Sequence, residues 1–292
     1  MIINNVRLIL ENELVAGSLE MRDGLIASFS ETPSRQPDAL DGEGGYLLPG
    51  LVELHTDNLD KFFAPRPKVD WPAHSAMSSH DALMVASGIT TVLDAIGVGD
   101  VRDGGHRLDN LSKMIDAIRD SNRKGLNRAE HRLHLRCELP HHATLPLFEA
   151  LMGTPELSLV SLMDHSPGQR QYASLEKYRE YYQGKYALND QEMDAFEHEQ
   201  LTLAAEGLLD ILSSDYYPAS LLDAAFRLAA DERNPLALPQ AVALVTRNPA
   251  CALGLTDRGV IAEGRRADLV LAHTDHGHPH IRHVWAQGRQ VY

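Results

Sequence analysis

Cysteine is scarce in this chain of 292 residues. It has only Cys137 and Cys251, and neither is part of a C-x-x-C pair. So few thiols exclude a disulfide framework and a cysteine-based zinc motif. We expect both cysteines to be small buried apolar residues.

Long hydrophobic runs are also absent. No stretch approaches the ~18 consecutive apolar residues that a membrane-spanning helix needs. The first residues, MIINNVRLILENELV, show no basic segment followed by a small-residue cleavage site. We therefore expect a cytoplasmic location and no membrane partner.

Positive charge is in short supply. Lysine and arginine number 27 against 41 acidic residues, which gives a net charge of −14. This balance argues against nucleic acid or an anionic membrane as a general partner. A small phosphorylated substrate is still compatible with it, provided that arginines or a metal ion supply local positive charge.

The two ends of the chain differ in character from its middle. Residues 1–48 and 255–292 consist of short strand-like runs and Gly-containing turns, which predict a small β-sandwich domain built from both termini. Residues 49–254 alternate strands with helices, which predicts a parallel sheet in a catalytic α/β domain.

Polar, ligand-capable residues recur at the ends of the predicted strands. After the opening strand, we expect strands over 88–98, 131–139, 157–165 and 208–220, and a helix over 106–125 that stops at Gly125. The polar residues at the strand ends are His55 and Asp57, Asp94, Glu138, Asp164 and His165, and Ser214 and Asp215. In a (β/α)8 barrel of the TIM type all these ends meet at one mouth. The chain has no G-x-G-x-x-G or Walker motif, so the barrel is favoured over an open doubly wound sheet.

The stretch LVELHTDN ends the first of these strands. Side chains alternate along a strand, so His55 and Asp57 share one face and point to the same place. Metal ligation is the favoured interpretation, and a plain polar strand end or a helix cap is the alternative. Glu53 lies on the same face, one step deeper, where we expect it to orient His55.

Several motifs carry a family resemblance: PGLVELHTDN, GITTVLDA, LRCELPHH, MDHSPGQRQ and LLDILSSDYYPASLL. They resemble the amidohydrolase superfamily, and in particular its branch in phosphonate catabolism, the carbon–phosphorus lyase pathway. The resemblance implies a metal-dependent diphosphatase that converts α-D-ribose 1-methylphosphonate 5-triphosphate to the 5-phosphate and pyrophosphate. Other proteins of that pathway are then expected partners.

The resemblance also implies a set of site residues. The metal ligands would be His55, Asp57, Glu138, His165 and Asp215, with Asp215 also catalytic. The cofactor would be one or two divalent ions, with zinc favoured over manganese or iron. Candidate substrate-binding cations are Lys61, Arg66, Arg136 and Arg170.

Alternatives stay open for individual residues. Asp215 could instead cap a helix that starts near Pro218, and Glu138 could be a salt-bridge partner. Any one of the arginines could be a surface charge. The five histidines of 273–283 are not expected to bind metal, because they lie in the terminal domain away from the strand-end mouth.

The strand count is too low for a closed barrel. Only 50 positions separate His165 from Asp215, and five strands are visible where eight are needed. We predict that roughly 90 residues, or three βα units, are absent near Gln200 and Leu201, either deleted or disordered.

Two other functions compete with the diphosphatase. One is an amidohydrolase that acts on a C–N bond, such as a cyclic amide hydrolase or a deaminase. The other is a non-catalytic homologue. A homodimer is the commonest assembly for such a protein and is expected here.

Overall fold

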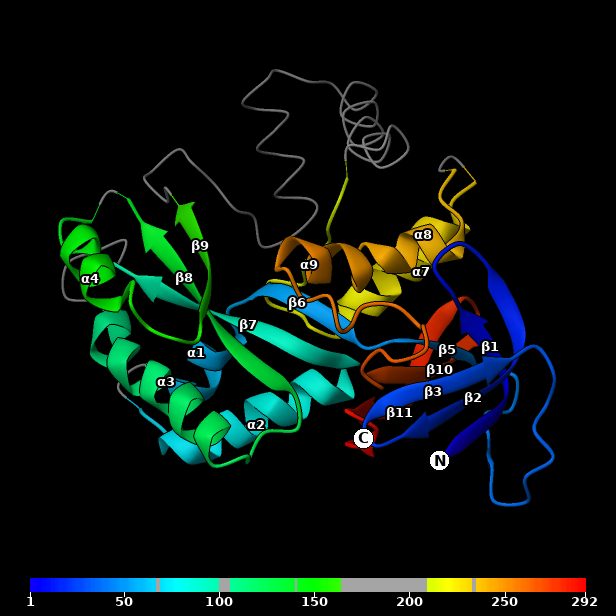
Figure 1. The fold of residues 1–292 in the computed structure, drawn as a ribbon. Coiled ribbons are helices and arrows are strands. Elements are labelled where there is room, and N and C mark those ends of the chain that lie inside the picture. Colours follow the sequence, from blue (N-terminus) through cyan, green and yellow to red (C-terminus); the bar gives the residue numbers. More distant parts are fainter. Residues whose placement is uncertain (67–68, 100–105, 140, 164–208, 233–234) are drawn as a thin grey trace.

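A computed structural model describes all residues except 67–68, 100–105, 140, 164–208 and 233–234. The described residues form two sheets, one of eight strands and one of four (Figure 1). The predicted junction near Gln200 and Leu201 lies outside the described residues. In the described part of the chain, no helix is both long and apolar enough to cross a membrane.

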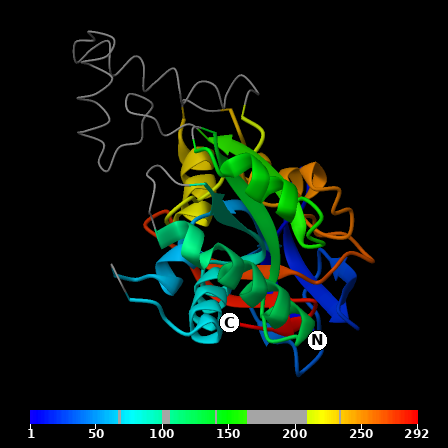
Figure 2. The same cartoon turned by 90° about the vertical axis from the view of Figure 1, so that its left-hand side faces the viewer.

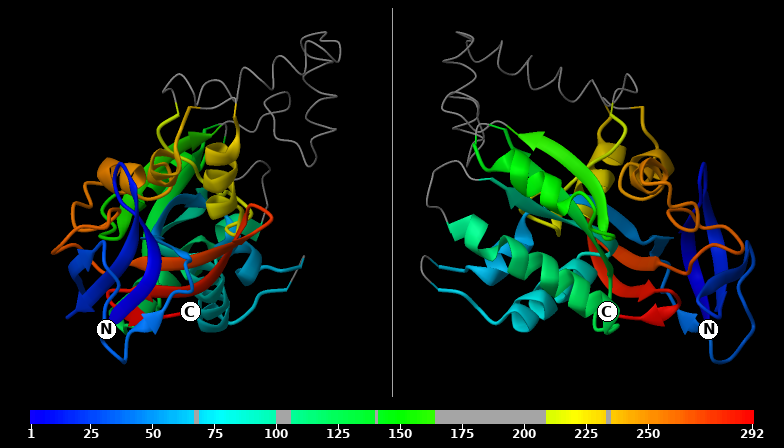
Figure 3. Two further views of the ribbon diagram at one scale, coloured as in Figure 1. Left: turned by 90° about the vertical axis from the view of Figure 1, so that its right-hand side faces the viewer. Right: turned by 60° about the vertical axis from the view of Figure 1, so that its left-hand side comes forward.

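The eight-stranded sheet joins the two ends of the chain. Its strands run in the order β12-β11-β10-β5-β1-β2-β3, with β4 beside β1. They are β1 Ile2–Ile9, β2 Leu14–Arg22, β3 Leu25–Ser30, β4 Leu40–Asp41, β5 Tyr46–Pro49, β10 Leu269–Asp275, β11 His278–Ala286 and β12 Arg289–Gln290. The N- and C-termini therefore lie near each other on one body (Figure 3). Its core includes Leu8, Leu19, Leu269 and the fully buried Trp285.

The four-stranded sheet is entirely parallel and has the sequential order β6-β7-β8-β9. Its strands are β6 Leu51–Thr56, β7 Ile89–Val98, β8 Glu130–Glu138 and β9 Leu157–Met163. The connecting helices are α1 Asn58–Phe63, α2 Ala73–Ala86, α3 His106–Arg123 and α4 Thr144–Leu151. Sequential parallel strands with helical crossovers are the repeating unit of a βα barrel. The strands predicted over 88–98, 131–139 and 157–165 are confirmed within two residues at each end.

Helices α2 and α3 cover one face of the parallel sheet (Figure 2). Leu111, Ile115 and Ile118 of α3 lie at helical spacing and are buried in one cluster with Leu133 and Leu135 of β8. The helix predicted from this spacing is confirmed, and it ends before Gly125, which has a φ of +62°. The other face of the sheet is therefore the one left to line a barrel interior.

A second cluster fixes the parallel sheet to the terminal sheet. Three helices follow Asp215 in the chain: α7 Ser220–Ala230, α8 Leu238–Ala243 and α9 Arg247–Ala252. Leu221 and Phe226 of α7 pack with Leu51 of β6 and with Val270 and Val284 of the terminal sheet. This packing anchors α7 beside the start of β6 and so brings the preceding residues toward the end of that strand.

Two sequence predictions are wrong. The segment predicted as a strand over 208–220 is no strand in its described part, from residue 209 on, and makes only an isolated bridge between Asp215 and Thr56. Asp215 has a φ of +52°, which interrupts an extended ladder. Cys137 is buried as expected, but Cys251 is exposed near the end of α9.

Gly50 links the two sheets, and a side chain there has no room. A methyl group on Gly50 would lie 2.2 Å from Thr90 Oγ1 and 2.9 Å from Thr90 Cβ. Thr90 is buried and its branched Cβ cannot rotate away. We expect Gly50→Ala to lower the free energy of unfolding by about 1–3 kcal/mol in urea denaturation. The control is Gly153→Ala, because no atom of another described residue beyond its chain neighbours lies within 4 Å of the added methyl group. Equal stability of the two variants would contradict the clash.

Candidate metal and catalytic site

The site begins at the carboxyl end of β6, where the strand passes directly into α1. His55 is near the end of the strand and Asp57 stands just before the helix. The backbone of Asp215 runs alongside: its N–H donates to His55 O at 3.1 Å, and its carbonyl accepts from Asp57 N at 3.2 Å and from Thr56 Oγ1 at 2.9 Å. A residue about 160 positions later in the chain is thus held against the strand end.

His55, Asp57 and Asp215 form a group of potential metal ligands. One donor atom from each lies within 4.8 Å of the other two. His55 Nε2 is 3.5 Å from Asp215 Oδ1 and 4.0 Å from Asp57 Oδ1. Asp57 Oδ1 is buried and has no hydrogen-bond partner among the described residues, so an acceptor oxygen is free to bind a cation. An imidazole with two carboxylates is a donor set that suits zinc, manganese or iron.

The second oxygen of Asp57 is already paired. Arg136 Nη2 of β8 lies 3.3 Å from Asp57 Oδ2, and both side chains are about nine-tenths buried. The Arg136 guanidinium neutralises the Asp57 carboxylate and holds that carboxylate in its orientation. The predicted substrate cation Arg136 therefore lies at the site, in contact with a predicted ligand.

His134 of β8 packs edge-on against His55, with 4.9 Å between the ring centroids. Burial, with further contributions from the neighbouring His55 and Arg136, lowers the pKa of His134 to about 4, so its ring is neutral near pH 7. His134 Nδ1 lies 3.0 Å from Leu54 O, and His134 Nε2 lies 2.7 Å from Ser161 Oγ. A neutral ring satisfies both by donating from Nδ1 and accepting at Nε2.

The remaining predicted residues are placed less closely. Lys61 Nζ donates to Tyr216 O at 3.0 Å and to Asn58 Oδ1 at 3.3 Å, so it lies beside the residue after Asp215. Arg66 is exposed after α1 and forms an isolated bridge with Val69. Glu138 is buried at the end of β8 but is not in the ligand group that the described residues form. His165 and Arg170 lie outside the described residues.

Glu53 is more deeply involved than the sequence suggested. It points inward as expected and is fully buried, but it accepts the backbone N–H of His55 at 2.8 Å and does not contact the imidazole. It also accepts the N–H of Ser214 at 2.9 Å and the hydroxyl of Ser213. Burial raises the pKa of Glu53, while these hydrogen bonds act to lower it. The alternation of side chains along β6 gave its direction, and no sequence signal gave its partners.

The capping alternative for Asp215 is wrong. Helix α7 has Ala219 as its N-cap residue and no side-chain capping hydrogen bond. Asp215 lies four residues before that cap and turns toward His55 instead. Its side chain is 38% exposed, so the carboxylate is reachable from solvent.

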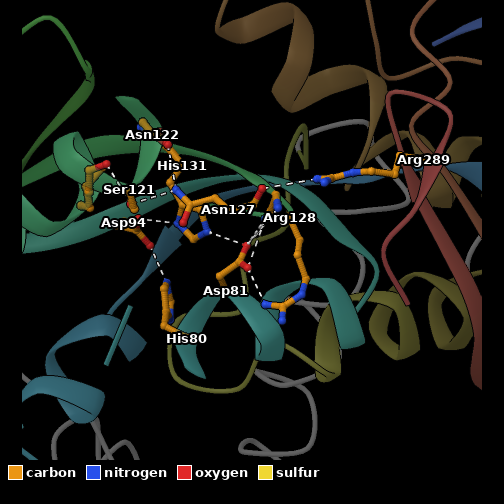
Figure 4. A network of polar contacts seen from close by, with 11 residues as sticks. His80, Asp81, Asp94, Ser121, Asn122, Asn127, Arg128, His131 and Arg289 are labelled. Atoms are coloured by element: carbon orange, nitrogen blue, oxygen red, sulfur yellow. Dashed lines mark hydrogen bonds and ion pairs between the residues drawn. The ribbon is translucent and has the colours of Figure 1, made fainter. Parts of the chain in front are cut away.

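Asp94 of β7 is not at the mouth, in contrast to the sequence prediction (Figure 4). It points toward the helices, where Oδ1 lies 2.6 Å from His80 Nε2 and Oδ2 lies 2.8 Å from His131 Nδ1. The other nitrogen of His131 is 3.3 Å from Asp81, which also binds Arg128 at 2.8 Å. Both nitrogens of His131 thus face carboxylates, as in a doubly donating imidazolium, which has no lone pair for a metal. This group is a buried ion-pair network.

This chain belongs to the amidohydrolase family. Residues 199–292 match that family directly, and the whole chain aligns with a curated relative of the same class. The relative is alpha-D-ribose 1-methylphosphonate 5-triphosphate diphosphatase of Escherichia coli strain K12. It is 56% identical over 378 residues, which cover 100% of this chain and 100% of the relative.

Solved structures support the same fold. N-acetylglucosamine-6-phosphate deacetylase from Thermotoga maritima matches 100% of this chain and 99% of its own at 15% identity and a TM-score of 0.60. 5-Methylcytosine deaminase from Klebsiella pneumoniae matches 100% and 98% at 12% identity and a TM-score of 0.64. At such low identity the likeness shows the fold alone, which is the predicted barrel of the TIM type.

The alignment with the relative is longer than this chain. It runs over 378 positions against 292 residues, which leaves 86 positions without a residue here. That excess agrees with the roughly 90 residues, or three βα units, predicted to be absent.

Proposed function

We propose that this chain hydrolyses α-D-ribose 1-methylphosphonate 5-triphosphate to the 5-phosphate and pyrophosphate. The observation that carries the proposal is the convergence of Asp215 on His55 and Asp57 at the end of β6. The 56% identity to a diphosphatase of that name supports the choice of substrate over a C–N bond. The site is thus proposed to act on a phosphoric anhydride.

A divalent ion is part of the proposal. Asp57 Oδ1 is buried without a hydrogen-bond partner in the described part of the chain, and this oxygen and the close approach of the three donor atoms fit such an ion. His55, Asp57 and Asp215 would hold it, with Glu138 and His165 as further predicted ligands, and zinc is favoured over manganese or iron. When bound, the ion lowers the pKa of water and stabilises negative charge on phosphoryl oxygens.

The side chains of this site have three further proposed roles: proton transfer, orientation of a metal ligand, and binding of phosphate oxygens. Asp215 is partly exposed beside His55, so its carboxylate can orient the attacking water and take its proton. Asp57 is held by Arg136 and keeps its place during the reaction. Lys61, Arg66, Arg136 and Arg170 are the proposed cations for the phosphate oxygens and for the charge that develops on the leaving pyrophosphate.

The substrate also bears on where the protein works. A sugar triphosphate carries several negative charges and does not cross a membrane unaided, which supports the proposed cytoplasmic location. A homodimer and contacts with other proteins of phosphonate catabolism stay predictions.

The decisive experiment uses the purified full chain and the ribose 5-triphosphate phosphonate. We expect pyrophosphate and the 5-phosphate in equal amounts, loss of activity with a chelator, and recovery on adding zinc. Ribose 5-phosphate is the control, because it has no anhydride bond to cleave. Bound metal without pyrophosphate release would instead favour C–N chemistry, and a protein with neither metal nor release would be a non-catalytic homologue.

A further inference from the structure

The Asp215 segment has few backbone contacts of its own. Its described residues 209–219 contain no strand or helix. Apart from the hydrogen bonds of Asp215 and Ser214, its main chain is tied to other described segments at three points. Leu212 N–H donates to Leu244 O at 3.0 Å, Asp210 O accepts from Asn248 Nδ2 at 2.8 Å, and Tyr216 O accepts from Lys61 Nζ at 3.0 Å. Asp215 has a φ of +52°, which an L-residue rarely adopts without support. The conformation that aims its carboxylate at His55 therefore needs contacts from outside the segment.

Glu53 supplies those contacts through both oxygens of one side chain. Oε1 accepts the N–H of His55 at 2.8 Å and the hydroxyl of Ser213, and Oε2 accepts the N–H of Ser214 at 2.9 Å. The side chain is fully buried and no ion pair with Glu53 occurs among the described residues. A buried carboxylate is costly unless donors satisfy it, and here all three donors belong to the two chain segments that carry the ligand group.

We infer that Glu53 is a positioning residue that joins the strand end of His55 to Ser213 and Ser214 and thereby fixes Asp215. The inference rests on the proposed function for its kinetic consequences, but its effect on the ligand group is independent of the substrate. Outer groups that orient metal ligands typically change metal affinity or activity by 10–100-fold when they are lost.

Glutamine cannot replace Glu53 in this role. Each carboxylate oxygen faces a backbone N–H, so one end of the amide would place its NH2 group against the N–H of His55 or Ser214 in either orientation. Ser214 would have to withdraw, and Asp215 is the next residue. Ser213→Ala is the milder change, because it removes one donor and leaves both backbone bonds.

The test measures zinc affinity of the full chain by competition with a chromogenic chelator, and separately measures kcat and KM for pyrophosphate release. We expect Glu53→Gln to weaken zinc binding and lower kcat by about 10–100-fold, with KM changed less than threefold. Ser213→Ala should lower kcat by about fivefold, as for one lost hydrogen bond. If Glu53→Gln does not fold, Ser213→Ala alone carries the test.

Asp268→Asn is the matched control. Asp268 is also a buried carboxylate that accepts a backbone N–H, from Gln287 at 2.7 Å, but it lies in the terminal domain beside Arg266. It should lose stability with no change in zinc affinity or kcat. Wild-type zinc affinity and kcat in both Glu53→Gln and Ser213→Ala would overturn the inference. Zinc binding without pyrophosphate release in the wild type would overturn the proposed function instead, and the affinity comparison would still test Glu53.

Discussion

Asp215→Asn should lower kcat for pyrophosphate release by about 10³-fold, since a positioned general base contributes 10²–10⁴-fold. Asparagine has nearly the same shape, but its amide oxygen takes no proton from water and carries no charge toward a cation. Asparagine also tolerates a positive φ, so the +52° backbone at this residue is preserved. The loss should therefore be chemical, and the melting temperature should stay within a few degrees of the wild type.

Three measurements distinguish a loss of proton transfer from a loss of metal or of folding: pyrophosphate release, zinc content after dialysis, and thermal unfolding. The control is Asp210→Asn, because Asp210 is an exposed carboxylate on the same segment. It should retain wild-type turnover and melting temperature. An Asp215→Asn protein with more than half of wild-type kcat would show that another group takes the proton.

The side-chain alternation of a strand was enough to predict which side chains of β6 share one face. His55, Asp57 and Glu53 share one parity along LVELHTDN, and the structure places all three on the site side of β6. The alternation predicts the face to which each side chain points, but it does not predict which residues that side chain contacts. The contacts of Glu53 with Ser213 and Ser214 join positions 160 residues apart, which a local pattern does not contain.

Two failures have a common cause. The 208–220 stretch is apolar and ends in polar residues, as a barrel strand would, yet a positive φ at Asp215 and hydrogen bonds to a side chain replace the ladder. Asp94 ends a β-branched run, as a mouth residue would, yet it faces the helices and pairs with two histidines. Hydrophobic pattern cannot distinguish a polar residue at the mouth from one with buried partners.

The helices and strands around the site were easier to predict than the contacts of its polar residues. Leu111, Ile115 and Ile118 at helical spacing predict α3, and the β-branched run of 89–98 predicts β7. These elements are determined by many apolar contacts that each favour the same structure. Single polar residues have no such redundancy.

Asp94→Asn should lower the free energy of unfolding by about 3–5 kcal/mol, as expected when one partner of a buried ion pair is removed. Asp94 and His131 are both fully buried, and the substitution leaves the imidazolium with Asp81 alone. Urea denaturation at pH 6 measures the change. The control Asp116→Asn removes an exposed partner of Arg119 and should cost less than about 1 kcal/mol. Equal losses in the two variants would mean that the buried network contributes no more than a surface ion pair.

The same network predicts how stability depends on pH. Burial alone would lower the pKa of His131, but the charges and hydrogen bonds of Asp94 and Asp81 outweigh it and raise the pKa to about 9 from an ordinary 6.5. Because the folded pKa is the higher one, this contribution to stability is complete below pH 6.5 and is lost as the pH rises through 9. Burial raises the pKa of Asp94, but the ion pair with His131 and the hydrogen bonds with His131 and His80 outweigh it and hold this pKa below its ordinary 3.8. The contribution of Asp94 to stability is therefore lost only in acid below pH 3.8. Unfolding curves from pH 5 to 9.5 should show declining stability above pH 6.5, and the decline should shrink in Asp94→Asn, where His131 has lost a partner. A flat profile from pH 6.5 to 9, with the His131 ring titrating near 6.5 by NMR, would contradict a charged imidazolium in the core.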